Sequence, residues 1–268
     1  MGGGKSGKNT KAARRARESV VRQRSIPWLT IAGVGVVLVV ALAVFVPLAL
    51  KVSDRNQAAE QQEQADAAAA RFRPSPQNPD PSRQIPGVIT ADYPGQQHVR
   101  PDQRVAYDRT PPFGGPHDGI WADCTGVVYP QPVRTENMVH SLEHGAVWIA
   151  YDPAKVGPDG VERLRGKVQN RPYTMMSPYP GMDRPISVQS WGHQLKVDSP
   201  DDPRIDQFTT ALRQNPNGVY PEVGGACQAY PGAFDTQNPP PFDPSPAPPD
   251  AVQMDGRGAN AGPMGSGQ

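Results

Sequence analysis

Histidine is the residue type whose positions in this sequence suggest chemistry. Two of the five histidines lie in the segment 135–145 (TENMVHSLEHG), whose first and last residues mark the expected ends of a short helix. Residues four apart lie one turn apart on the same helix face, so His140 and His144 can bind one metal ion together. His117 lies in the Gly/Pro-rich segment PPFGGPHDG, a loop that can bring a third ring nitrogen.

The fourth expected ligand decides which metal is favoured. The segment YTMMSPYPGM contains Met176, whose thioether can join the three imidazoles. This mixture of donors suits copper(I) better than zinc, so we predict a metal site made of His117, His140, His144 and Met176, with copper favoured and zinc as the alternative. In the competing interpretation the methionine fills the core and the histidines form hydrogen bonds with neighbouring loops.

A zinc-dependent hydrolase is a further alternative. The residues His140, Glu143 and His144 match the H-x-x-E-H signature of inverted zinc peptidases, in which the glutamate activates a metal-bound water. Matches of five residues arise by chance, and the expected helix is short. The sequence also contains no G-x-S-x-G elbow and no P-loop. We therefore assign no catalytic residue and favour a binding role over an enzyme.

One segment is suited to crossing a membrane. Residues 28–50 carry no charge, and a helix of this length covers the roughly 30 Å core of a bilayer. The segment before it is basic, and the positive-inside rule then places the N-terminus in the cytoplasm and the C-terminal domain outside it. A cleaved signal peptide is the alternative, but the apolar run is longer than the usual 7–15 residues and no clear small-x-small cleavage site follows it. The basic side chains are Lys5, Lys8, Lys11, Arg14, Arg15, Arg17, Arg22 and Arg24, against Glu18.

Composition divides the chain into five parts. The lipid bilayer is an expected partner and nucleic acid is not, because the basic tail is explained as a topology signal that touches anionic lipid. The Pro-rich and Gly-rich segments contain too few apolar residues to form a core. The parts are a basic disordered cytoplasmic tail (1–25), a transmembrane helix (26–50), a helical stalk with a Pro-rich linker (51–84), an extracytoplasmic globular domain (85–237) and a disordered tail (238–268).

The globular part is predicted to be an α+β domain with a small mixed sheet. Apolar periodicity and turn residues indicate the order strand, helix, strand, strand, helix, which suggests this fold class. Asp202 and Pro203 are suited to the start of the last helix. The expected elements are a strand at 146–151, a helix at 159–169, a strand at 173–177, a hairpin at 185–197 broken at Gly192, and a helix at 202–213.

Cys124 and Cys227 are the two cysteines of the chain. Outside the cytoplasm a disulfide is the default, and closing a loop of roughly 100 residues would stabilise the fold by about 4 to 5 kcal/mol. Two thiolate metal ligands or two free thiols are the alternatives.

Several segments resemble a known family. They are PPFGGPH (111–117), Trp121, CTGVVYPQPV (124–133), VHSLEHGAVWIAY (139–151), MSPYPGM (176–182) and SWGHQL (190–195). They resemble the largely actinobacterial family called domain of unknown function 3105, with VHSLEHG as the most specific piece. The similarity covers roughly residues 98–228. It implies a bacterial envelope location, since membrane anchors are common in the family, and it supplies no activity.

Three hypotheses of function follow. The first is a membrane-anchored extracytoplasmic domain that binds a transition metal. The second is a non-catalytic envelope protein whose loops bind another envelope protein. The third is the zinc hydrolase. The convergence of His117, His140 and His144 in space is the observation that separates them most directly.

Overall fold

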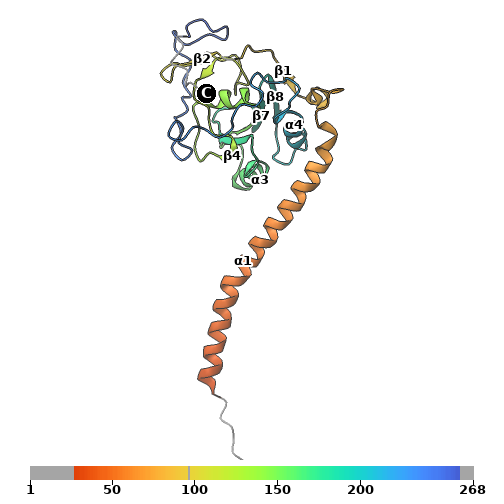
Figure 1. Cartoon of the computed structure of the whole chain (residues 1–268). Coiled ribbons are helices and arrows are strands. Elements are labelled where there is room, and N and C mark those ends of the chain that lie inside the picture. Colours follow the sequence, from red (N-terminus) through yellow and green to blue (C-terminus); the bar gives the residue numbers. More distant parts are fainter. Residues whose placement is uncertain (1–26, 96, 260–268) are drawn as a thin grey trace, which may run out of the picture. The chain divides into compact units, whose positions relative to one another are not determined.

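The computed structural model describes residues 27–95 and 97–259. The predictions for the basic tail and for the last nine residues lie outside this range. The chain divides into two compact units, one up to Ser53 and one from Asp54 onward. Helix α1 (Trp28–Ala69) begins in the first unit and ends in the second (Figure 1).

The first part of α1 carries apolar side chains that no other described part of the chain covers. Val37, Val39 and Phe45 are each more than 60% exposed. Among the described residues α1 is the one helix long and apolar enough to cross a membrane. The expected apolar helix is therefore present, and it continues as a polar helix through the predicted stalk.

The second unit contains a six-stranded mixed sheet, as the sequence predicted. The strand order is β1-β8-β7-β5-β6-β4. Strands β5, β7 and β8 pair antiparallel, whereas β6 runs parallel to both β5 and β4. The strands are β1 (Ile89–Thr90), β4 (Thr125–Val128), β5 (Val147–Tyr151), β6 (Thr174–Pro178), β7 (Ile186–Ser190) and β8 (His193–Val197).

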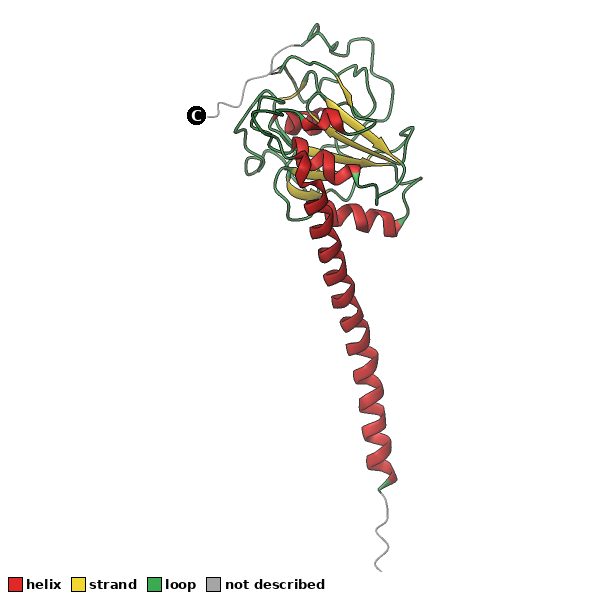
Figure 2. Ribbon diagram, turned by 90° about the vertical axis from the view of Figure 1, so that its right-hand side faces the viewer, coloured by secondary structure: helices red, strands yellow, loops and turns green. Residues whose placement is uncertain are grey.

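Successive side chains along a strand point to opposite faces of the sheet, and both faces of this sheet are buried. On β5, Val147 and Ile149 join one apolar cluster, whereas Trp148 and Ala150 join another. Helices α3 (Pro158–Val168) and α4 (Arg204–Leu212) and the short helix η1 (Ala70–Phe72) cover the first face (Figure 2). Helix α2 (Thr135–Glu143) and long loops cover the second face.

The packed region extends beyond both predicted ends of the domain. Before the expected start at residue 85, the Phe72 ring is buried in the core, and a second short helix, η2 (Pro81–Gln84), forms part of the predicted linker. After residue 238, the tail is not disordered throughout. Val252 is fully buried, accepts a hydrogen bond from Ala106 N (2.8 Å) and donates one to Arg104 O (2.8 Å). Phe72 joins the apolar cluster of α3 and α4, and Val252 forms a small cluster with Val99 and Val105.

A two-stranded parallel sheet, which the sequence analysis did not predict, lies beside α2. It consists of β2 (His98–Val99) and β3 (His117–Asp118), and its register pairs His98 with His117. Each strand has two residues, too few to show an alternating pattern in the sequence.

Candidate metal centre

Three elements bring four histidines together. The pairing of β2 with β3 places the rings of His98 and His117 5.0 Å apart, measured between centroids. Helix α2 supplies His140, whose ring lies 4.7 Å from that of His117 and 4.7 Å from that of His144. His144 directly follows α2, and Gly145 then adopts a positive φ of 88°, a conformation that glycine favours and that ends helices.

The ligand atoms form two overlapping groups. We call His98, His117, His140 and Glu143 the inner group, and His140, His144 and Glu222 the outer group. Within each group, one nitrogen or carboxylate oxygen of every residue lies within 4.8 Å of the others. All nine residues of α2 are buried, so this helix carries His140 and Glu143 into the interior rather than to the surface.

Backbone carbonyls orient three of the rings in the same way. The Nδ1 atoms of His117, His140 and His144 lie 2.8, 2.6 and 2.7 Å from the carbonyl oxygens of Gly115, Asp118 and Ala226. A carbonyl can only accept, so each Nδ1 must carry the hydrogen and donate it. Each Nε2 is then the nitrogen left to bind a cation, the arrangement typical of histidines that bind metals.

Two of these Nε2 atoms face carboxylates. His117 Nε2 lies 2.8 Å from Glu143 Oε2, and His144 Nε2 lies 3.0 Å from Glu222 Oε2. An imidazole lone pair and a carboxylate oxygen repel each other at this distance unless a positive charge lies between them. A shared proton fits this distance directly, whereas a metal ion fits once the two ligand atoms move apart. The convergence of further ligands is the observation that supports a metal.

The protein environment keeps two of the rings neutral. Burial lowers the pKa of His140 well below its usual value, and the neighbouring His117, His144 and His98 lower it further. Burial also lowers the pKa of His98, with a further contribution from His117. Neutral imidazole is the form that binds metals, so neither His98 nor His140 has to lose a proton before it binds an ion.

Charged side chains behind α2 fix its position. Asp118, whose carbonyl accepts from His140, also forms an ion pair with Arg134 at the start of the helix. Glu136 accepts a hydrogen bond from Val105 N at 3.0 Å. Such contacts hold the first turn of α2 against the loops, so the ligands are placed on a rigid element.

Aromatic side chains surround the centre. The ring of Trp121 lies 4.7 Å from His144 and 5.4 Å from His140, and Trp191 lies 5.8 Å from His117. The side chains of His117 and Glu143 are fully buried. Three members of the inner group are therefore buried, and His98 is half-buried with a buried Nε2.

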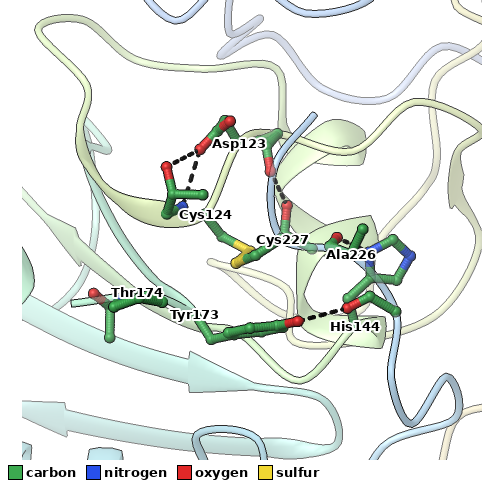
Figure 3. The surroundings of a disulfide bond; sticks show 12 residues. Asp123, Cys124, His144, Tyr173, Thr174, Ala226 and Cys227 are labelled. Carbon is green, nitrogen blue, oxygen red and sulfur yellow. Dashed lines mark hydrogen bonds between the residues drawn. A yellow bond between two sulfur atoms is a disulfide. The ribbon is translucent and has the colours of Figure 1, made fainter. Parts of the chain in front are cut away.

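The disulfide connects the segment before β4 to the segment that follows Glu222. Cys124 and Cys227 have their sulfur atoms at bonding distance and their Cα atoms 5.0 Å apart, and Cys124 N donates to Cys227 O at 3.0 Å. Figure 3 shows His144 beside the residue before this bond, where its Nδ1 donates to Ala226 O. Tyr173, at the start of β6, donates its hydroxyl hydrogen to Gly225 O at 2.9 Å.

The structure brings together three of the four predicted ligands. His117, His140 and His144 converge, whereas Met176 does not. Met176 is fully buried in the cluster between the sheet and helices α3 and α4. Its neighbour Met175 points to the other face, because successive strand residues alternate.

Three ligand candidates were missed from the sequence. His98 is separated from the other histidines by a loop, and Glu222 lies far along the chain in an irregular segment. Glu143 was considered only as a catalytic base. The buried Nε2 of His98 has no hydrogen-bond partner within the described part of the chain, which is the clearest structural sign of its availability.

The fifth histidine lies outside both groups. His193 donates from Nδ1 to Trp191 O at 2.6 Å, and its Nε2 lies 3.2 Å from Asp80 Oδ2. It thus has the same kind of partners as His117 but no further ligand candidates nearby. A substitution of His193 is therefore a matched control for a substitution of His117.

Comparison with known families agrees with the resemblance noted in the sequence. Residues 98–229 match the model of the family described as "Protein of unknown function (DUF3105)". The match begins at His98 and includes every member of both groups. Searches of curated proteins and of solved structures gave no match.

Proposed function

We propose that the domain binds one divalent transition-metal ion through His98, His117, His140 and Glu143. The observation that carries this proposal is the convergence of three imidazoles and one carboxylate within 4.8 Å in the interior. Buried charges and polar groups cost free energy unless they are paired, and a metal ion pairs all four at once.

The donor set favours zinc or copper(II). Three nitrogens and one oxygen suit these borderline ions, whereas the thioether that favoured copper(I) belongs to Met176, which packs elsewhere. Ligand atoms around a tetrahedral zinc ion lie roughly 3.3 Å apart, given bond lengths of about 2.0 to 2.1 Å. Binding would therefore bring together those ligand atoms that are up to 4.8 Å apart, and it would separate His117 Nε2 from Glu143 Oε2, which lie 2.8 Å apart.

The geometry supports a holding site rather than a hydrolase. Four protein ligands complete a tetrahedral shell, whereas catalytic zinc keeps one position for water. Glu143, the base in the hydrolase hypothesis, is fully buried and 2.8 Å from His117. A buried shell of this kind gives a substrate no access to the ion.

We further propose that α1 anchors the domain in the cell membrane, with the N-terminus in the cytoplasm. The support is the apolar length of α1 and the excess of Lys and Arg before it. A periplasmic-type reporter fused after Gln268 should be active only when exported. Activity of a cytoplasmic reporter at that position would contradict the orientation.

Metal analysis of the full-length chain in detergent tests the binding proposal. The wild type, loaded at neutral pH and freed of excess ion, should retain about one equivalent of zinc or copper. His117→Asn should lose it, and His193→Asn should keep it, because His193 has similar partners but belongs to neither group.

Two outcomes would contradict the proposal. Wild-type protein without bound metal would favour the alternative of a protein-interaction module in the envelope. Full metal retention in His117→Asn would show that the ion is bound elsewhere. Equal metal loss in both variants would mean that the loss is not specific to the inner group, and circular dichroism shows whether the variants are folded.

A further inference from the structure

The outer group differs from the inner group in its exposure. The side chain of Glu222 is 30% exposed and that of His144 is 4% exposed, whereas those of His117 and Glu143 are fully buried. His98 is also half-buried, but its Nε2 is buried, so Glu222 is the partly exposed carboxylate of the two groups that a cation from solvent can meet.

His140 belongs to both groups but can serve only one ion at a time. Its Nδ1 donates a hydrogen bond to Asp118 O, so Nε2 is the one ring nitrogen left to bind a metal ion. The ring centroids of His117 and His144 both lie 4.7 Å from that of His140. The two groups thus describe two positions for an ion, and His140 is the ligand common to both.

The loop of Glu222 is connected directly to the inner group. Glu222 N donates to Glu143 O at 3.1 Å, so the two carboxylate residues are joined through their backbones. A Cβ on Gly225 would lie 2.7 Å from a ring carbon of His144, and one on Gly95 would lie 2.6 Å from Glu143 Oε1. Glycines at these two positions let the backbone lie close against the ligands, so only backbone atoms of these residues separate the ligands from the space outside the loops.

We infer that Glu222 and His144 form the entry position through which a metal ion reaches the inner group, with His140 passing it inward. This inference rests on the proposed function. A partly exposed carboxylate attracts a hydrated cation and replaces some of its water, and His144 and His140 replace more. The ion then exchanges ligands one at a time, which avoids the full cost of dehydration.

The rate of metal uptake tests this inference. Full-length protein in detergent, stripped by chelator, is mixed rapidly with cobalt(II), whose absorption reports nitrogen and oxygen coordination. Glu222→Gln should slow uptake by on the order of tenfold, since steering by charge changes rates by 10 to 10³. The final stoichiometry should remain one equivalent with nearly unchanged affinity.

Matched variants define the specificity of the effect. Glu162→Gln removes an exposed glutamate of α3 that pairs with Arg165, and it should load at the wild-type rate. Glu143→Gln should weaken the equilibrium affinity itself. His144→Asn should resemble Glu222→Gln, with slower uptake and one equivalent at the end.

The outcomes separate this inference from the proposed function. Uptake by Glu222→Gln at the wild-type rate would overturn the entry position and leave the inner site intact. A wild type that binds two ions, one of which Glu222→Gln loses, would also overturn it, since the outer group would then be a site of its own. If the wild type takes up no cobalt, the proposed function fails, and the entry position with it.

Discussion

The two faces of the six-stranded sheet are stabilised in different ways. The face toward α3 and α4 is packed with aliphatic side chains and Phe208, which form one apolar cluster. The face toward α2 carries aromatic side chains and the disulfide, and α2 brings buried histidine and glutamate side chains to it. The first face is mainly apolar, and the largely buried ion pair of Lys167 and Asp206 joins its two helices. The second face contains histidine and glutamate side chains, whose burial is unfavourable unless they are paired.

This difference between the two faces indicates that the α2 face, which contains the candidate metal ligands, is the functional one. An apolar face gains about 25 cal/mol per Å² of buried apolar surface without any specific partner. The α2 face must offset buried polar groups with a covalent link, backbone hydrogen bonds and, in our proposal, a metal ion. The following predictions test that division.

Removing the disulfide should have the largest effect. In Cys124→Ala combined with Cys227→Ala, the free energy of unfolding should fall by about 4 to 5 kcal/mol, because the bond spans 103 residues. Urea denaturation of the full-length chain measures the change. A loss below about 1 kcal/mol would show that the α2 face does not depend on the cross-link.

Truncating the aromatic side chain on the opposite face should cost slightly less. Phe208 of α4 is fully buried, and Phe208→Ala should lower the free energy of unfolding by about 3 to 5 kcal/mol. Because this face holds no candidate ligand, metal stoichiometry should stay at the wild-type value. A simultaneous loss of metal would mean that the two faces are not independent.

Metal binding should stabilise the domain by an intermediate amount. At a free metal concentration one hundred times Kd, stabilisation is about 2.7 kcal/mol. For a unit of this size, that is roughly 5 to 10 °C in Tm. Thermal melts with zinc and with chelator should show this difference in the wild type and in His193→Asn, and not in His117→Asn. Magnesium should have no effect, since it prefers oxygen ligands.

The smallest effect on the free energy of unfolding should come from replacing Asp80, whose side chain links the linker to His193 of β8. Burial alone would raise the pKa of Asp80, but hydrogen bonds from His193 and Ser82 outweigh it and lower the pKa to about 2. The carboxylate therefore stabilises the fold above pH 3.8, and this contribution is lost as the pH falls toward 2. Asp80→Asn should cost about 1 kcal/mol at pH 6 after allowance for solvent screening, and nothing near pH 2. A pH-independent difference would assign the effect to packing.

The sequence predicted the elements with a clear local pattern. Strands β5 to β8 and helices α3 and α4 appear within a few residues of their expected ends, because apolar periodicity and turn residues mark them. The helical spacing of His140 and His144 likewise predicted that both rings would lie close together, and their centroids are 4.7 Å apart.

Long-range pairing and strand register could not be read from the sequence. His98 joins His117 through a bridge of two-residue strands, which leaves no periodic signal. Met176 lies on the opposite face because a shift of one residue along a strand changes the face. The buried Val252 shows the same limit, since its partner Val105 is far away in the sequence.

The disulfide makes the chain between Cys124 and Cys227 a covalent ring. His140, Glu143, His144 and Glu222 lie inside this ring, whereas His98 and His117 lie outside it. An ion bound by the inner group would therefore link the segment that contains His98 and His117 to this covalent ring. Losing the ion would release β2 and β3 while the ring stays closed, so the apo protein should open locally. Faster amide hydrogen exchange at these two strands alone would be its signature.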